Sequence, residues 1–224
     1  MTPGLNPAPR MTRLHAIGWT LFTLVLGLGL SGCQLGTASE AKRGKELFQT
    51  CVPCHGPAGA GRREVAAPGI AGMSTWYIQQ ELHKFVSGAR GTNFDDAEGM
   101  HMQPMALSLA TDEDVKAVSQ YVASLPQPKH VSTLGGDAKA GQALYATCIA
   151  CHGANGEGNQ VLKAPRVAGV EDWYLTAELR KFKSGVRGTD PEDQEGQMMH
   201  NMTVTLANDK AIQDVVAYIE TLKP

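Results

Sequence analysis

The sequence contains one pattern twice, in which two cysteines are separated by two residues and are followed at once by histidine. The two copies are Cys51-Val52-Pro53-Cys54-His55 and Cys148-Ile149-Ala150-Cys151-His152. This pattern is typical of c-type haem attachment, because each cysteine can add across a haem vinyl group to form a thioether. The adjacent histidine is then held under the iron as an axial ligand. The motifs therefore predict two covalently bound haem c groups.

Other uses of paired cysteines fit the sequence less well. A structural zinc site needs four cysteine or histidine ligands close together in space. A dithiol redox motif usually lies in a mixed α/β pattern and does not require the following histidine. The fifth cysteine, Cys33, stands apart from both motifs, so haem attachment would occupy every paired thiol.

Both motifs belong to a long internal repeat. Their first cysteines are separated by 97 positions, since 148 − 51 = 97, and the same separation relates residues far beyond the motifs without any gap. The matched positions are Gly44 with Gly141, Pro68 with Pro165, Trp76-Tyr77 with Trp173-Tyr174, Lys84-Phe85 with Lys181-Phe182, Arg90-Gly91-Thr92 with Arg187-Gly188-Thr189, Glu98-Gly99 with Glu195-Gly196, Tyr121 with Tyr218, and Leu125 with Leu222.

The repeat predicts two copies of one domain, at residues 41–125 and 139–224. Residues 126–138 would form the linker, which is rich in proline at its start and in glycine near its end. The aromatic content of 6% is low for a large conventional core. A haem macrocycle would supply a flat apolar core element in its place.

Each copy is predicted to be helical. In the first copy, residues 41–51 form a helix that leads into the haem motif, and residues 56–72 form a loop rich in Gly, Ala and Pro. Ser74 or Thr75 then caps a helix that ends near Gly88. The apolar face of this helix is Ile78, Leu82 and Phe85.

The last helix of each copy follows a long loop, which in the first copy continues through residues 99–109. Its start is marked by Thr111-Asp112-Glu113-Asp114, a cap followed by acidic residues in the first turn. In the second copy Asn208 is the cap. The predicted buried stripes are Val115, Val118, Val122 and Leu125, and Ile212, Val215, Val216 and Ile219. No segment alternates like a strand, so the predicted fold class is all-α.

The N-terminus has the composition of a targeting segment. Arg10 and Arg13 precede an apolar run at residues 16–30, and Leu30-Ser31-Gly32-Cys33 resembles a bacterial lipoprotein box. Residues 1–32 would then be a signal peptide and residues 33–40 a tether carrying lipid on Cys33. The alternatives are an uncleaved anchor, although the run is shorter than the ~20 residues that span a bilayer, an ordinary signal peptide, and a structural thiol. Met11 could be the true start.

Charge and the residue after Cys33 bear on partners and location. The formal charge of −2 does not suggest a nucleic-acid partner. The resemblance to lipoproteins implies several acyl chains, which are enough for stable attachment to a membrane. Gln34 follows the cysteine, and no Asp retention signal is present. By analogy with bacterial lipoproteins, this favours the outer membrane, facing the periplasm.

The order of these elements resembles a class I cytochrome c. An N-terminal helix leads into Cys-x-x-Cys-His, a methionine-containing segment follows, and the final amphipathic helix contains Tyr121 or Tyr218. Two such domains in one exported chain resemble the two-haem periplasmic cytochromes of the cytochrome c4 group. Haem-bearing subunits of terminal oxidases and dehydrogenases look similar too. The resemblance covers roughly residues 40–224.

The second axial ligand of each iron must come from outside the motifs, and the repeat helps to select candidates. Histidines do not recur in register, because His101 lies opposite Met198 and His200 lies opposite Gln103. Methionines do recur: Met102 matches Met199, and Met105 matches Met202. Each pair precedes the last helix, where the family places its ligand.

The resemblance favours Met102 and Met199 as the ligands opposite His55 and His152, because related cytochromes with a single methionine here keep this first position. Met105 and Met202 remain alternatives. The second methionine of each pair would then be a soft side chain that fills a gap beside the haem.

Other repeated residues have implied roles. Pro68 and Pro165 resemble the family proline whose carbonyl accepts the ring N–H of the iron-bound histidine. Trp76, Tyr77 and Arg90, with their copies, could contact haem propionates. The alternatives are core packing for the aromatic residues and a solvated turn for Arg90 and Arg187.

Histidine and methionine ligation predicts a one-electron carrier, because both axial positions of the iron are filled and methionine favours the ferrous state. The resemblance implies electron transfer from a quinol-oxidising complex or a periplasmic dehydrogenase to a terminal oxidase or reductase, through small transient contacts. The alternatives are a haem-bearing subunit of a larger oxidoreductase and a two-haem peroxidase. A peroxidase would need one open iron position and an asymmetric pair of sites, whereas the ligand regions here are nearly symmetric.

Overall fold

The computed structural model describes residue 1 and residues 32–223, with side chains from residue 38 onward. The proposed signal peptide at 1–32 lies almost wholly outside the described residues, and so does the side chain of Cys33. The chain divides into two compact units, Met1–Thr37 and Ala38–Pro224. The second unit contains both haem motifs, and no described helix is long and apolar enough to cross a membrane.

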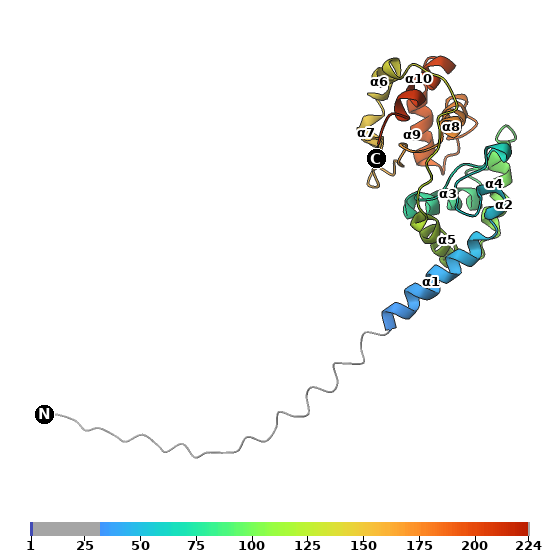
Figure 1. Cartoon of the computed structure of the whole chain (residues 1–224), viewed down its shortest axis with the longest axis vertical. Helices are drawn as coiled ribbons and strands as arrows, with labels where there is room; N and C mark the ends of the chain where they lie inside the picture. The colour runs from blue at the N-terminus through green and yellow to red at the C-terminus, as the bar shows by residue number, and fades with distance from the viewer. Residues whose placement is uncertain (2–31, 224) are drawn as a thin grey trace. The chain divides into compact units, whose positions relative to one another are not determined.

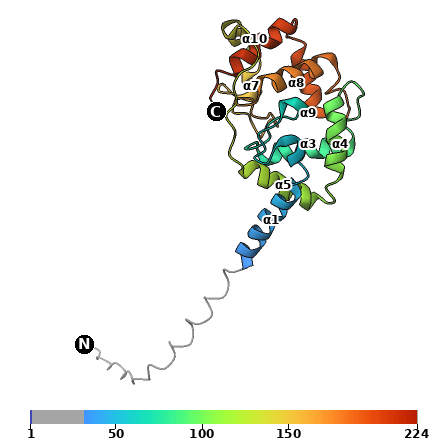
Figure 2. The same ribbon diagram turned by 45° about the vertical axis from the view of Figure 1, so that its right-hand side comes forward.

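Helices account for the regular structure of the described residues (Figures 1 and 2). The first repeat contains α1 (Gly32–Phe48), α2 (Val52–His55), the 3₁₀ helix η1 (Arg63–Val65), α3 (Thr75–Ser87), α4 (Ala97–Leu107) and α5 (Asp112–Ser124). The second contains α6 (Ala138–Tyr145), α7 (Ile149–His152), α8 (Asp172–Ser184), α9 (Gln194–Thr203) and α10 (Asp209–Ile219). The described residues form no strand beyond the isolated bridges Arg62–Ala67 and Asn159–Ala164, which confirms the all-α prediction.

The predicted caps of the last helices are present. The Thr111 side chain accepts a hydrogen bond from the Asp114 amide at 3.1 Å, and Asn208 accepts one from the Ala211 amide at 3.0 Å. These bonds satisfy amides that have no partner within the first turn of a helix. The predicted stripes of α5 and α10 are buried, apart from Leu125, which is half-buried.

One prediction is wrong: the methionine segments are helices and not loops. Residues 97–107 form α4, and the matching residues form α9. Gly99 and Pro104 lie within α4, although both residue types disfavour a helix interior. The buried Asp96 accepts a hydrogen bond from the Gly99 amide at 3.0 Å and caps the helix despite them. Asp193 caps α9 in the same way.

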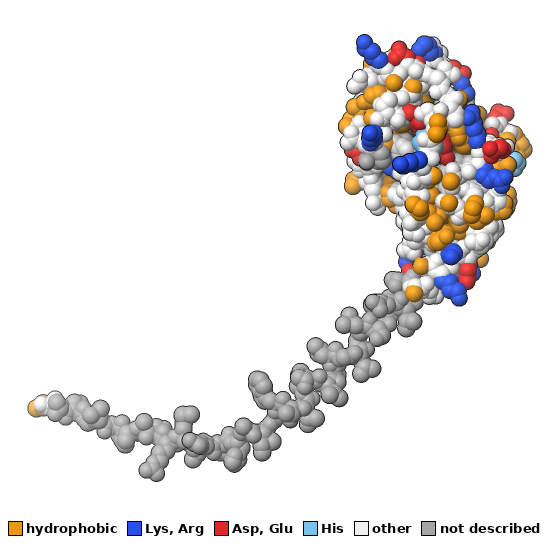
Figure 3. Space-filling view, in the orientation of Figure 1, with side chains coloured by type: hydrophobic (Ala, Val, Ile, Leu, Met, Phe, Trp, Pro, Cys, Tyr) orange, Lys and Arg blue, Asp and Glu red, His pale blue; other side chains and the backbone are white. Residues whose placement is uncertain are grey.

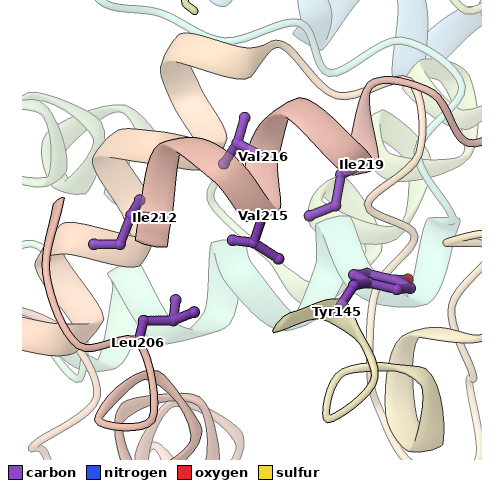
Figure 4. Close-up of a cluster of buried hydrophobic side chains, with 6 residues drawn as sticks. All are labelled: Tyr145, Leu206, Ile212, Val215, Val216 and Ile219. Carbon is purple, nitrogen blue, oxygen red and sulfur yellow. The ribbon is translucent and has the colours of Figure 1, made fainter. Parts of the chain in front are cut away.

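Each repeat has its core where its first long helix crosses its last. Gly44 on α1 lies so close to α5 that an added Cβ would overlap the Ala117 carbonyl. Gly141 meets the Asp214 carbonyl of α10 in the same way. Phe48 packs on Tyr121, and Tyr145 packs on Tyr218, with ring centroids 5.4 Å apart in both pairs. Figure 4 shows the second core, which consists of Tyr145, Leu206, Ile212, Val215, Val216 and Ile219.

The two repeats meet through buried charges. Arg90 donates to Glu81 of its own repeat at 2.6 Å and to Glu178 of the other at 3.1 Å. Arg187 donates to Glu178 and, at 2.6 Å, to Glu81. We call these four residues the central cluster. Arg90 is 9% exposed and Arg187 6% exposed, so the predicted alternative of a solvated turn is wrong for both.

Two lysines flank the central cluster and reach across to the methionine helices. Lys84 contacts Asp193, the cap of α9, at 2.6 Å. Lys181 contacts Asp96, the cap of α4, at the same distance.

The glutamates of the central cluster are ionised although they are buried. Burial alone would raise the pKa of Glu81, but the positive charges of Arg187 and Arg90 outweigh it and hold that pKa at about 2, below its ordinary value of 4.5. The central cluster is therefore ionised and balanced in charge.

Candidate haem-binding sites

Each motif lies on a single helical turn. The chain leaves α1, and the Cys51 amide donates to the Phe48 carbonyl at 2.9 Å. The His55 amide then donates to the Cys51 carbonyl at 2.9 Å, so that both cysteines and the histidine share this short turn. The second motif has the same pattern, with His152 bonded to Cys148 at 2.8 Å. The structure thus brings the two attachment cysteines and the histidine together in both repeats.

Both histidine rings are oriented by a proline carbonyl. The Nδ1 atom of His55 lies 2.8 Å from the Pro68 oxygen, and that of His152 lies 2.8 Å from the Pro165 oxygen. A carbonyl can only accept, so Nδ1 carries the proton and Nε2 presents its lone pair. This is the bond that the family resemblance implied, and it gives the tautomer that iron ligation through Nε2 requires.

A glycine allows the proline loop to approach the histidine. The Gly61 amide donates to the His55 carbonyl at 2.9 Å, and its φ of +83° suits glycine. A Cβ at this position would lie 2.5 Å from the Gly69 nitrogen. Gly158 has the same φ and the same close contact, there with the Arg166 nitrogen. These glycines therefore hold the proline carbonyls within reach of the imidazoles.

The titration of the site groups suits haem attachment. Burial lowers the pKa of both His55 and His152, which favours the neutral, metal-binding imidazole. For His55, the Pro68 carbonyl and the Glu171 carboxylate act in the opposite direction. Burial raises the pKa of the Cys51 thiol to about 11. The reactive thiols of redox-active dithiols have lowered pKa values, so the raised pKa of Cys51 argues against that function.

A cleft of mainly apolar character adjoins the second motif. It is lined by Cys148, Cys151, His152, Leu175, Leu179, Phe182, Val215, Ile219 and the methionines Met198, Met199 and Met202, among others. Thiols, a neutral imidazole and thioether sulfurs are ligands and anchors suited to haem c, and an apolar lining suits its macrocycle. The residues present therefore fit the group. Apolar side chains also gather on the face of the unit drawn in Figure 3.

Each methionine helix presents both candidate ligands, three residues apart and so on one face. Met102 and Met199 are half-buried. Met105 is 41% exposed, and Met202 is 38% exposed. Met199 and Met202 both line the cleft, so its lining does not distinguish between them. The assignment of Met102 and Met199 stays a prediction.

The aromatic residues singled out from the repeat pack together. Trp76 and Tyr77 are half-buried with ring centroids 5.8 Å apart, and their copies Trp173 and Tyr174 are 5.9 Å apart. Tyr77 and Tyr174 both line the cleft beside the second motif. Burial raises the pKa of Tyr174, so its hydroxyl stays protonated. A contact of these residues with propionates stays a prediction.

Several site-related residues escaped the sequence reading. Glu81 and Glu178 are related by the same offset of 97, and this signal was available. The contact of Lys84 with Asp193 could not be predicted from the repeat. The repeat aligns Lys84 with Lys181 and Asp96 with Asp193, and it does not say which lysine contacts which aspartate. Glu171 departs from the repeat, since Ser74 occupies the matching position. A search for recurring residues passes over it.

The chain is similar over most of its length to known proteins. The family model described as cytochrome c matches residues 41–126 and again residues 138–223. A thiosulfate dehydrogenase electron acceptor from Stutzerimonas stutzeri (strain A1501) is 27% identical over 92% of this chain and 95% of its own. Cytochrome c4 from Thiocapsa roseopersicina is 31% identical over 77% of this chain and 86% of its own.

A solved structure shares the fold. The crystal structure of reduced recombinant cytochrome c4 from Pseudomonas stutzeri matches with a TM-score of 0.63 and 24% identity, over 82% of this chain and 98% of its own. With two matched domains and two attachment motifs, the chain belongs to the cytochrome c family. It is a two-domain electron carrier similar to cytochrome c4, with two covalently bound haem c groups. Each haem supplies one iron that alternates between the ferric and ferrous states.

Proposed function

We propose that the chain carries single electrons in the bacterial periplasm while it is tethered to a membrane. Its donor would be a periplasmic dehydrogenase or a quinol-oxidising complex, and its acceptor a terminal oxidase or reductase. The observation that carries this proposal is the pairing, in each repeat, of a carbonyl-oriented histidine with a methionine-bearing helix. The histidine and a methionine would together hold the iron of each haem, which would then exchange electrons without taking up a substrate.

A dehydrogenase is the donor that we favour. The electron acceptor of thiosulfate dehydrogenase named above matches nearly the whole chain. Two haems on one chain allow one site to face a donor while the other faces an acceptor. Encounters of this kind use small interfaces, because the partners must separate after each transfer.

Rapid mixing of the oxidised two-haem protein with thiosulfate and a thiosulfate dehydrogenase tests the donor. We expect the haem absorption to report uptake of two electrons per chain, one at each iron, at a rate that rises with dehydrogenase concentration. Reduction by dithionite serves as the control for haem content. Full reduction by dithionite together with no reduction by the dehydrogenase would exclude this class of donor.

The tether can be tested at its first residue. Replacing Cys33 with serine removes the thiol that would be lipidated, so the protein should move from the membrane fraction to the soluble periplasmic fraction. Gln34→Asp is the matched control, since it keeps the thiol and should retain the protein on a membrane, the inner one. Immunoblots of separated fractions provide the measurement. Unchanged membrane attachment of the Cys33→Ser protein would mean that lipid on Cys33 is not the anchor.

A further inference from the structure

The peptide group between Pro68 and Gly69 makes hydrogen bonds at both of its ends. Its carbonyl oxygen accepts from Nδ1 of His55 at 2.8 Å. Its N–H, which belongs to Gly69, donates to Oε1 of Glu171 at 2.8 Å. Glu171 comes from the second repeat, so a carboxylate of one domain is linked through a single peptide group to the haem-binding histidine of the other.

Glu171 lies directly before α8, at the position where a side chain often caps a helix. Its side chain makes no capping bond and is used for the contact with Gly69 instead. The approach depends on the absence of a side chain at Gly69, because a Cβ there would lie 2.6 Å from Oε1 of Glu171. The contact therefore depends on a glycine at position 69 and on a Glu171 side chain that is not used as a helix cap.

The second repeat lacks the same arrangement. Ser74 occupies the position that matches Glu171, and Arg166 occupies the position that matches Gly69. The Arg166 guanidinium is hydrogen-bonded to the Ala168 carbonyl at 3.1 Å and to the Gly72 carbonyl at 3.2 Å. The peptide group that accepts from His55 thus donates to a carboxylate. The matching peptide group at His152 lies between Pro165 and Arg166 and carries a cationic side chain.

A carboxylate on the N–H of a peptide group polarises that group and makes its carbonyl oxygen a stronger acceptor. A stronger bond to Nδ1–H gives the imidazole more imidazolate character and makes Nε2 a better electron donor to a metal. Ferric iron gains more from such a donor than ferrous iron does. The expected direction is a lower reduction potential for the iron bound by His55.

We propose that Glu171 is a positioning residue for the first haem: through the Pro68–Gly69 peptide group it strengthens the hydrogen bond of His55 and lowers the reduction potential of that haem alone. The proposal rests on the two haems and not on the identity of any redox partner. It makes the potential of the first domain depend on the docked second domain.

The test uses the full-length, haem-loaded protein with Glu171→Gln, which removes the charge and keeps the size. We expect the ferrous-to-ferric ratio of the first haem at a fixed potential to rise about fivefold, since a charge-assisted bond becomes a neutral one. Fivefold corresponds to about 40 mV for one electron. NMR of the reduced protein should show the Nδ1 proton of His55 shifted upfield, as in a weaker bond, and that of His152 unchanged.

Two further variants make the result specific. Gly69→Ala pushes the carboxylate away and should shift the His55 proton in the same direction while leaving Glu171 charged. Glu64→Gln removes an exposed carboxylate from the same loop and should change neither signal. An unchanged His55 proton in both Glu171→Gln and Gly69→Ala would overturn the proposal. So would an equal change at both haems, or a change of potential without a change of the His55 proton.

Discussion

Replacing Met102 with leucine should remove about half of the iron–methionine charge-transfer absorption of the oxidised protein, and replacing Met199 should remove the other half. Two irons contribute one band each, and leucine has no sulfur to donate. The affected haem should also fall in potential, because loss of the thioether removes a ligand that favours ferrous iron. Visible spectroscopy combined with a redox titration provides both measurements.

The second methionine of each helix is the matched control. Met105→Leu and Met202→Leu change the same chemical group, three residues further along the same helix, and should leave the band intact. Met102 and Met199 are half-buried, whereas Met105 and Met202 are more exposed, which supports this choice. Loss of the band in Met105→Leu or Met202→Leu would assign the ligands the other way round.

The second large effect is expected at the contact between the repeats. Replacing Arg90 with methionine should lower the free energy of unfolding by about 3–5 kcal/mol, because it leaves Glu81 and Glu178 buried with one guanidinium between them. Denaturant unfolding of the haem-loaded protein, followed by circular dichroism, measures the loss.

Arg180→Met is the control for this effect. Arg180 also forms a paired contact with a carboxylate, at 3.1 Å to Asp209, but both side chains are about half exposed or more. Exposed ion pairs contribute roughly 0–1 kcal/mol, so the control should lose little stability. Similar small losses in both variants would show that the central cluster does not hold the repeats together.

Sequence reasoning succeeded where local chemistry decides the structure. The attachment motif needs only five adjacent residues, and the caps at Thr111 and Asn208 act within one turn of helix. The buried stripes follow from helical periodicity. The register of the repeat added Pro68 and its copy Pro165, whose carbonyls accept from the two histidines.

Sequence reasoning failed where the structure depends on competing local signals or on contacts between distant parts of the chain. A loop was predicted through residues 99–109, but the cap at Asp96 and the contact of that carboxylate with Lys181 stabilise a helix. A solvated turn was the alternative considered for Arg90, and that alternative is wrong. The burial of Arg90 depends on the second repeat, which no local pattern reports.

The reciprocity of the charges between the repeats has a consequence for the history of the chain. Lys84 contacts Asp193 as Lys181 contacts Asp96, and each arginine of the central cluster contacts both glutamates. A contact in which residue i meets j and j meets i is the isologous interface of a twofold homodimer. An ancestral single-haem protein could therefore have paired with itself before its gene was duplicated and fused. Joining two such halves in one chain raises their effective concentration, so that the contact persists without strong self-association of either half.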